Sequence, residues 1–545
     1  MWHSYWTAAL LAGLATSSAS SASSASSSPD IRQIAVIGAG AAGASTAFHL
    51  QRFAAASNIT LNVTLFEKTS RIGGRTLTVD VFDDPHQPVE LGASIFVQVN
   101  EIIWSAIDEF NLPRIPAGSA DGDDAAESDS IFGIWDGDKF VYTEDDASSD
   151  WWNLARLFWT YGTAPYRANK LMRGTITKFL QLYKAPYFPF RSLTTRAHEL
   201  ELAAITSQTG AAFLEASGIS YAFAHDLVQA STRVNYASNL AGIHGLDTMV
   251  ALAPQGASQI KGGNWQVFDA MVQAAADSGH VHWLGNTTVT GIARADGTAP
   301  PASRYVVSTS DESLATLDFD NVVLAGPQQF SGIKTGAGVL QTPIVPIDYV
   351  QLHVTLFTTP LKLSAQYFGL APGSKVPTTV LTTLAEDDDP NGSSGLDGTG
   401  KAGFFSVSAL RRVVNPDTLR EEYVYKIFSP DKVTASLLSK LFAVGIPETG
   451  LDNNDTGADA GQRSLSPISW FYPHVFYSYP KAVPRTTFQD PVVGDGVYYT
   501  SGIESFISTM ETSALMGKNV ARLIVDDIQG LSTGHAVHKA ANEEL

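Results

Sequence analysis

Short apolar runs alternate with longer stretches of helical character near the start of the chain. Ile34–Ile37 is apolar throughout, as expected for a buried strand. A glycine-rich turn and an alanine-rich stretch follow, and they predict a helix that ends near Phe53. A second apolar run, Leu61–Phe66, ends in Glu67. This order of strand, helix and strand predicts the beginning of an α/β sheet.

Similar patterns continue along the rest of the chain, and polar loops separate them. Helical spacing predicts helices over residues 151–182, 194–217, 267–276 and 508–526. Apolar runs predict strands over residues 280–284, 289–293, 302–308, 320–327, 345–359, 423–428 and 496–504, the last of which ends in a turn. Surface loops are expected over residues 117–129, 387–400 and 452–461.

The glycines after the first apolar run have the spacing of a dinucleotide-binding turn. Gly38 makes the tight turn, Gly40 lets the backbone approach a pyrophosphate, and Gly43 lets the helix pack closely on the strand. The free N–H groups at the helix start favour phosphates. Glu67, 24 residues after Gly43, can accept hydrogen bonds from ribose hydroxyls. An ordinary glycine-rich turn is the alternative, but the strand, the helix and the acid together favour dinucleotide binding.

A second glycine motif indicates which dinucleotide is bound. Glu67 is followed by Gly73-Gly74-Arg75 and then by Glu90–Ser94. This arrangement resembles the flavoprotein superfamily of amine oxidases and their relatives, so FAD is the favoured cofactor. The resemblance implies that the second glycine pair passes close to the FAD pyrophosphate and that Arg75 neutralises it.

The same resemblance assigns later parts of the chain to the flavin. It implies that the backbone at Val289 holds adenine, although an ordinary core valine fits equally well. It also implies that the start of the helix over residues 508–526 faces the flavin pyrimidine ring, where negative charge develops on reduction. A terminal packing helix is the alternative. The expected cofactor residues are Gly38, Gly40, Ala42, Gly43, Glu67, Lys68, Gly74, Arg75, Gly92, Ala93, Ser94, Val289, Gly502, Ile503 and Glu504.

The length of 545 residues is too great for one simple core, so two interleaved domains are expected. We predict an α/β fold in which a discontinuous Rossmann-like FAD-binding domain is interleaved with a mixed-sheet α+β substrate domain. The first is expected at residues 31–115, 255–345 and 490–530, and the second at 116–254 and 346–489. The formal net charge of −19, without a prominent basic cluster, disfavours nucleic-acid binding and suits an acidic extracellular or vacuolar compartment.

The N-terminus and the glycosylation sequons indicate the secretory pathway, with an extracellular, vacuolar or lysosomal destination. Trp6–Ala15 is an apolar run too short to span a bilayer, and residues 17–28 are almost all Ser and Ala. These features predict a cleaved signal peptide within residues 1–28, and a disordered tail is the alternative. Candidate glycosylation sites are Asn58, Asn62, Asn286, Asn391 and Asn454.

The chain contains no cysteine, which removes disulfides, thiol catalysis, thiolate metal sites and a cysteinyl–flavin bond. No cluster of His, Asp and Glu has metal-ligand spacing, so no metal is expected. No later segment has the character of a transmembrane helix. No catalytic dyad or triad motif is recognisable, so the sequence identifies no catalytic residue.

Four stretches resemble the prenylcysteine oxidases, also called prenylcysteine lyases. The first is the N-terminal fingerprint, which the whole superfamily shares. The other three are Arg233–Tyr236 with Lys261–Asn264, Val424–Ser429, and Trp470–His474 with Tyr498-Tyr499, Gly502–Glu504 and Met510–Ala514. Arg233–Tyr236 and the segments from Tyr498 to Ala514 are much more specific than the N-terminal fingerprint. Together the matches span residues 31–527. The acidic loops and the lack of cysteine resemble a divergent fungal-type member more than the animal enzymes.

The resemblance implies a thioether oxidase of prenylated-protein breakdown. It would split farnesylcysteine or geranylgeranylcysteine into cysteine and a prenyl aldehyde, while dioxygen becomes hydrogen peroxide. Carbon 1 of the prenyl group is both allylic and bonded to sulfur, so loss of hydride to the flavin gives a cation that is stabilised from both sides. Water then adds, and the hemithioacetal collapses. Positioning of carbon 1 and stabilisation of reduced flavin would suffice, without a strong protein base.

A prenyl substrate requires a long apolar tunnel with a polar end. Aromatic-rich segments at residues 151–161, 183–190 and 470–479 are candidates for the tunnel wall. Candidates for the amino-acid end are Arg233, Tyr236, Lys426 and His474, each of which also fits a structural role. Transient contact with a membrane surface, to collect a lipid substrate, is a further option.

Three other functions fit the sequence. An amine oxidase of the same superfamily would take hydride from a carbon bonded to nitrogen. A secondary-metabolism oxidase would act on another prenylated or sulfur-bearing compound. A secreted lipid-binding protein would retain FAD only as a structural group.

Overall fold

The computed structural model describes residues 31–117, 131–145, 150–253, 256–295, 304–311, 314, 317–389, 396–451 and 467–531. Residues from Arg32 onward form one compact unit, which is the fold described here. The predicted signal peptide, most of the loop at 117–129, the loop at 452–461 and the sequons at Asn391 and Asn454 lie outside the described residues.

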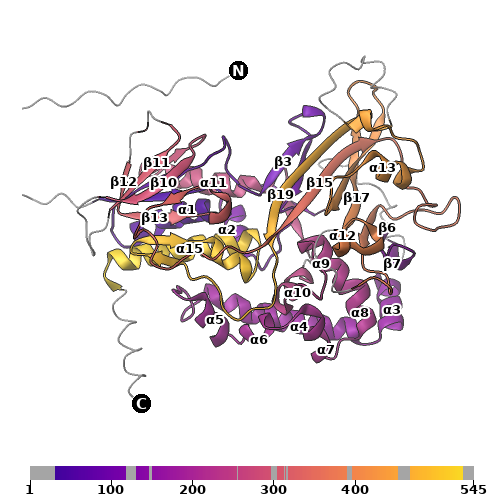
Figure 1. The fold of residues 1–545 in the computed structure, drawn as a ribbon, viewed down its shortest axis with the longest axis horizontal. Helices are drawn as coiled ribbons and strands as arrows, with labels where there is room; N and C mark the ends of the chain where they lie inside the picture. Colours follow the sequence, from indigo (N-terminus) through magenta and orange to yellow (C-terminus); the bar gives the residue numbers. More distant parts are fainter. Residues whose placement is uncertain are drawn as a thin grey trace, which may run out of the picture. The chain divides into compact units, whose positions relative to one another are not determined.

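A six-stranded sheet begins the fold, and its strands come from widely separated parts of the chain (Figure 1). All neighbouring strands are parallel except the edge pair β20–β21. In spatial order the strands are β20 (Val492–Gly494), β21 (Val497–Tyr499), β13 (Asn321–Leu324), β1 (Arg32–Ile37), β2 (Leu61–Phe66) and β9 (Val281–Leu284). This is the Rossmann-like sheet that the first apolar runs predict.

The two faces of this sheet are covered differently, because successive side chains of a strand point to opposite faces. Ile34 and Val36 of β1 pack in one core with the helices α1 (Ala41–Ala56), α2 (Glu101–Glu109), α11 (Trp265–Ala276) and α15 (Met510–Ile528). Ala35 packs in another core with a four-stranded sheet. In spatial order that sheet consists of β12 (Leu317–Phe319), β11 (Tyr305–Thr309), β10 (Val289–Arg294) and β14 (Lys334–Thr335).

A seven-stranded mixed sheet forms the second main layer. Its neighbouring strands are antiparallel except β16 and β6, which are parallel. In spatial order the strands are β19 (Trp470–Pro480), β15 (Tyr349–Thr359), β18 (Glu421–Ser429), β17 (Ser406–Val414), β16 (Thr379–Thr382), β6 (Ile131–Trp135) and β7 (Phe140–Asp145). The hairpin of β3 (Leu77–Asp80) and β4 (Pro88–Gly92) packs on one face of it, and α13 (Ala435–Phe442) packs on the other.

Helices fill the chain between β7 and residue 252, and they break where sequence spacing predicts continuity. The predicted helix over 151–182 is two helices, because Gly162 takes a left-handed conformation (φ +60°) and Pro165 restarts the helix. The predicted helix over 194–217 is three, since Glu201 has φ +57° and the Thr209 side chain caps a new start. The helices are α3 (Asp150–Tyr161), α4 (Ala164–Phe179), α5 (Leu193–Glu199), α6 (Ala203–Thr206), α7 (Gly210–Ala216), α8 (Tyr221–Phe223), α9 (Gln229–Tyr236) and α10 (Gly245–Ala251).

Smaller elements complete the fold. The remaining elements are the two-stranded pair β5 (Arg114–Pro116) and β8 (Ser258–Ile260), and the short helix α12 (Leu396–Thr399). The predicted α/β fold, with a Rossmann-like sheet and a mixed second sheet, is confirmed, whereas the predicted domain bounds stay a prediction. In the described part of the chain, no helix is long and apolar enough to cross a bilayer. No group of three or more His, Cys, Asp or Glu in that part could hold a metal ion.

Candidate functional site

The turn between β1 and α1 has the close backbone approach that its glycines predict. Gly38 has φ +108° and donates its N–H to the Phe66 carbonyl at 2.8 Å. A Cβ on Gly43 would lie 1.8 Å from the Gly38 oxygen, so only glycine fits there. A Cβ on Gly40 would meet only the Cα of Gly74, at 3.7 Å. The first glycine motif therefore lies against the second, with open space beside Gly40.

Glu67 follows β2 and is bonded directly to this turn. Its Oε2 accepts a hydrogen bond from the Ala39 N–H at 2.9 Å. Its Oε1 accepts from the N–H and the hydroxyl of Thr69, both at 2.9 Å. The side chain is buried, so the carboxylate is held beside the glycines in a fixed position.

A cavity of about 860 Å³ runs from the glycine motifs to the seven-stranded sheet and to α4. Most of the predicted site residues line it, and these are Gly38, Gly40, Ala42, Glu67, Lys68, Gly74, Arg75, Gly92, Ala93, Ser94, Tyr236, Val289, Lys426, His474 and Glu504. The predicted residues outside its lining are Gly43, Arg233, Gly502 and Ile503. The structure thus brings twelve of the fifteen predicted cofactor residues and three of the four predicted substrate residues to one cavity.

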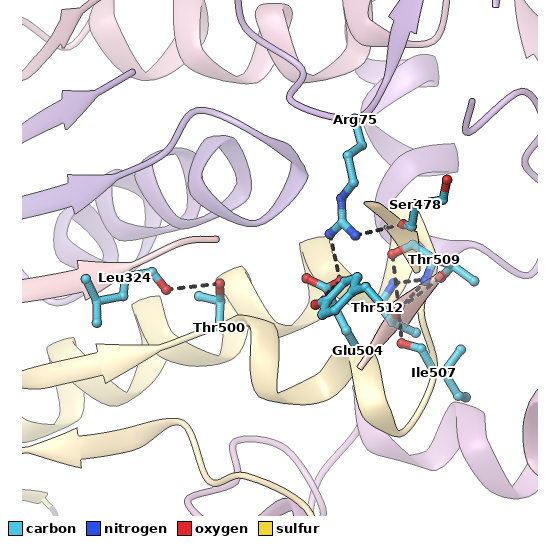
Figure 2. A network of polar contacts seen from close by, with 9 residues as sticks. Arg75, Leu324, Ser478, Thr500, Glu504, Ile507, Thr509 and Thr512 are labelled. Atoms are coloured by element: carbon cyan, nitrogen blue, oxygen red, sulfur yellow. Dashed lines mark hydrogen bonds and ion pairs between the residues drawn. The ribbon is translucent and has the colours of Figure 1, made fainter. Parts of the chain in front are cut away.

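Arg75 has protein partners that its predicted pyrophosphate role does not include. Figure 2 shows its guanidinium directed at Glu504 and at the Ser478 carbonyl, with distances of 2.7 and 2.8 Å. Tyr349 donates its hydroxyl to the same Glu504 oxygen at 3.0 Å. Burial opposes the charge on Arg75, but the Glu504 carboxylate raises the pKa of Arg75 above its ordinary value. This ion pair links the second glycine motif to β15, β19 and the C-terminal turn.

The start of α15 lies at the cavity, and its backbone groups are arranged by a capping box. The Thr509 hydroxyl accepts the Thr512 N–H at 3.1 Å, and the Thr512 hydroxyl accepts the Thr509 N–H at 3.0 Å (Figure 2). Residues 507–513 all line the cavity. The positive end of the helix dipole therefore lies at the cavity wall, where it favours a negatively charged ligand group.

Glu511, in the first turn of α15, is a buried acid that sequence reasoning missed. Its two carboxylate oxygens accept the N–H groups of Ile102 and Ile103 at 2.9 and 3.0 Å, which caps the start of α2. Burial raises the pKa of Glu511 to about 7, against the effect of these hydrogen bonds. The family match at Met510–Ala514 includes Glu511. Its partners Ile102 and Ile103 are about 400 residues earlier in the sequence, so no local pattern shows these hydrogen bonds.

Lys426 of β18 and Glu90 of β4 form a buried pair at the cavity wall. The Lys426 ammonium donates to the Glu90 carbonyl oxygen at 2.7 Å and to the Ser94 hydroxyl at 3.1 Å. Burial lowers the pKa of Lys426, although the Glu90 carboxylate opposes this shift. Burial raises the pKa of Glu90. The Asn264 N–H, which donates to the Glu90 carboxylate at 2.5 Å, and the charge of Lys426 both oppose this rise. Lys426 therefore offers a cationic donor to the polar part of the cavity.

Tyr236 and His474 also line the cavity, whereas Arg233 does not. Arg233 is fully buried, and its guanidinium donates to Thr382, Asn239, Gly398 and Thr399. These bonds hold α9 to β16 and to the segment at residues 398–399. The geometry gives no support to the substrate contact predicted for Arg233 and identifies it as a structural residue.

The far part of the cavity is apolar, as a lipid chain requires. Its wall includes Ile176 of α4 and the following Phe179 and Leu180. Of the predicted aromatic walls, residues 470–479 contribute through Phe476 and neighbours. The described parts of 151–161 and 183–190 do not line this cavity. Helix α4 was missed as a wall because its aliphatic residues resemble any core-facing helix side.

Comparison with known proteins agrees with this geometry. The prenylcysteine lyase family model matches residues 144–534, and the NAD(P)-binding Rossmann-like domain model matches residues 36–110. The farnesylcysteine lyase of Arabidopsis thaliana is 26% identical over 501 residues, which cover 88% of this chain and 86% of that protein. Prenylcysteine oxidase 1 of Bos taurus is 27% identical over 484 residues, covering 85% and 83%. Resemblance to fungal-type members stays a prediction.

Solved structures show the fold at lower sequence identity. Cyclohexylamine oxidase from Brevibacterium oxydans has a TM-score of 0.51 at 14% identity, covering 92% of this chain and all of that chain. Putrescine oxidase bound to putrescine has a TM-score of 0.51 at 13% identity, covering 91% and 99%. These structures share the architecture, while the match over residues 144–534 includes strands β15 to β19 of the seven-stranded sheet, the apolar cavity wall at α4 and the C-terminal helix. The chain therefore belongs to the prenylcysteine lyase family.

Proposed function

We propose that this protein is an FAD-dependent oxidase that cleaves the thioether of farnesylcysteine or geranylgeranylcysteine. The products are cysteine, the prenyl aldehyde and hydrogen peroxide. The observation that carries the proposal is the single cavity that joins a dinucleotide-binding turn to an apolar region bounded by α4. The activities named for the plant and mammalian relatives support the same reaction.

The residues of the first glycine turn fit FAD. The space beside Gly40, which a side chain would enter, lies between the two glycine motifs and suits a pyrophosphate. Glu67 and Val289 line the same cavity, and we assign the ribose to Glu67 and the adenine to the backbone at Val289. The start of α15, which lines the same cavity, suits the flavin ring system. When bound, the flavin supplies a two-electron acceptor for hydride and transfers the electrons to dioxygen.

The protein side chains position the substrate and control its solvation. The apolar wall at Ile176, Phe179 and Leu180 can bury a prenyl chain, which excludes water from it. Lys426 offers positive charge to the carboxylate of the cysteine end. After hydride leaves carbon 1, a water oxygen bonds to that carbon and gives up a proton. The C–S bond then breaks, the sulfur takes a proton as the thiol, and the aldehyde is released.

Flavin reduction should depend on the C–H bond at carbon 1. With substrate deuterated at that carbon, we expect a primary isotope effect on anaerobic bleaching of the flavin absorption. Saturating the nearest prenyl double bond should slow bleaching strongly, because the cation loses its allylic stabilisation. Shortening the far end of the chain should instead weaken binding, by about 0.8 kcal/mol per buried CH₂. Peroxide release from simple amines, with no bleaching by any prenyl thioether, would favour an amine oxidase.

Glu67 should contribute measurably to cofactor affinity. We expect Glu67→Ala to fold and to bind FAD roughly ten- to over a hundredfold more weakly, since charge-assisted hydrogen bonds contribute about 1.5–3 kcal/mol. The FAD dissociation constant measures this directly. Thr69→Val is the matched control, because it removes a donor to Glu67 but leaves the carboxylate in place. Equal affinities in both variants would contradict the ribose role.

We also propose that the protein enters the secretory pathway and carries N-linked glycans. Asn58 and Asn286 lie at exposed backbone turns, with φ of +52° and +55°, which suits modification. Asn62 lies in β2 and is half-buried, so it is the poorest candidate of the described sequons. Treatment of the protein from a eukaryotic host with an N-glycosidase should lower its apparent mass. An unchanged mass, with the N-terminal segment retained, would contradict this proposal.

A further inference from the structure

The charge of this protein is distributed very unevenly around α4. The chain has a formal net charge of −19, yet residues 151–198 contain no Asp or Glu. The basic residues of this stretch are Arg156, Arg167, Lys170, Arg173, Lys178, Lys184, Arg191 and Arg196. An acidic protein therefore carries one long segment of purely positive formal charge.

The outer face of α4 concentrates part of this charge. Tyr166, Lys170, Arg173 and Thr177 are spaced by four, three and four residues, so they form one row along the helix, and all are exposed. Within the described part of the chain, Lys170 and Arg173 form no ion pair with a carboxylate, whereas Lys178 pairs with Glu201 at 2.5 Å. The row thus presents two cations to solvent without neutralising acids.

Large aromatic side chains are exposed beside this row. Trp159 of α3 is 93% exposed, Tyr166 is 63% exposed, and Tyr221 of α8 is 76% exposed. The Tyr161 hydroxyl donates to Asp226 at 3.0 Å, which ties the end of α3 to the chain after α8. Arg167 donates to the Gly218 carbonyl at 3.2 Å, which ties α4 to the chain just before α8. These contacts place α3 and α4 beside the chain around α8 (Figure 1). We name the exposed residues of these helices the α3–α4 surface, which consists of Trp159, Tyr166, Lys170, Arg173 and Tyr221.

A neighbouring side of α4 reaches the apolar part of the cavity. Ile176 near the end of α4, with Phe179 and Leu180, lines the apolar wall described above. The same helix therefore contributes both to the α3–α4 surface and to the wall of the space proposed for a prenyl chain.

We propose that the α3–α4 surface docks on an anionic lipid bilayer. Trp and Tyr rings fit the headgroup region of a bilayer, and Lys and Arg are attracted by anionic headgroups. The acidic remainder of the protein repels the bilayer little, because charges more than about 10 Å apart are largely screened at 0.1 M salt. The proposed oxidase activity gives this docking its purpose, which is to bring a lipid substrate close to the cavity, but the docking itself does not require the activity.

Vesicle flotation of the full-length protein tests the surface directly. The probes are vesicles of phosphatidylcholine alone, and vesicles of phosphatidylcholine with an equal amount of phosphatidylserine. We expect binding to the anionic vesicles that weakens with added salt. Each basic side chain near such a surface contributes about fivefold, so Lys170→Gln with Arg173→Gln should lower the partition coefficient about thirtyfold. Trp159→Ser should lower binding to the same vesicles. It should also lower the residual binding that the wild type keeps at high salt.

Two comparisons make the test decisive. Lys432→Gln with Lys440→Gln changes the net charge equally at exposed positions around α13, and it should leave vesicle binding unchanged. Oxidation of a water-soluble, short-chain thioether should be unaffected by the α4 variants, which separates docking from catalysis. The proposal would be overturned if the wild type did not bind vesicles, or if both double variants lost binding equally. It would also be overturned if the wild type formed a dimer that Trp159→Ser dissociates and bound no vesicles.

Discussion

Gly40→Glu is expected to purify as a folded protein without bound FAD. A Cβ at this position meets no atom closer than the Gly74 Cα at 3.7 Å, so the protein itself accommodates the side chain. The carboxylate would then enter the space between the two glycine motifs, where it adds bulk and negative charge beside the pyrophosphate site. The visible absorption spectrum reports flavin content, and circular dichroism reports the fold.

A neighbouring glycine provides the contrast for this prediction. Gly43→Ala places a Cβ 1.8 Å from the Gly38 oxygen, so α1 must move away from β1, and we expect the variant to melt at a much lower temperature. The two variants thus separate loss of the cofactor from loss of the fold. Full flavin content in Gly40→Glu would show that the cofactor lies elsewhere.

Arg233→Met should be among the most destabilising single substitutions in this chain. It removes from a fully buried site the guanidinium that donates to the Thr382 hydroxyl, to the Asn239 amide oxygen and to the Gly398 and Thr399 carbonyls. Removal of one partner from such a network costs about 3–5 kcal/mol. Urea unfolding, followed by flavin release and by circular dichroism, should show a lower midpoint.

Arg412→Met is the matched control, because Arg412 lies exposed on β17, where it forms an ion pair with the exposed Glu421 at 3.5 Å and lies over the Tyr423 ring. We expect its unfolding midpoint to stay close to that of the wild type. If Arg233→Met kept full stability and lost only substrate affinity, Arg233 would instead be the substrate residue that its motif suggested.

The sequence predicted best where a short segment determines its own geometry. The turn from Gly38 to Gly43 requires glycine for reasons that act within a few residues, so its role is visible before any tertiary structure is known. The start of α15 is similar, because its helix pattern and the Gly502–Glu504 match locate it. Local rules also account for the errors. The helical spacing of apolar residues continues through Gly162, but the helical backbone ends there, because Gly162 is left-handed.

The sequence predicted least where a role depends on distant partners. Arg233 lies in one of the most specific matching motifs, but its buried hydrogen bonds show that its role is structural. Glu504 was expected beside the flavin, and only the folded chain shows that Arg75 pairs with it. Lys426 gains its significance from burial next to Glu90, which no spacing reveals. A family motif identifies an important residue, and the three-dimensional contacts show whether that residue has a structural or a binding role.

The Rossmann-like sheet has a consequence for the order in which the chain is made. β21 pairs directly with β13, and α15 packs along α1 so closely that a Cβ on Gly517 would lie 2.3 Å from the Ala42 oxygen. Both elements leave the ribosome long after β1, β13 and α1, so a nascent chain exposes an apolar sheet edge and an uncovered helix until they emerge. A chain that is truncated before residue 496 therefore keeps these surfaces exposed. We expect it to be bound by chaperones or degraded by proteases, rather than to be a less active enzyme.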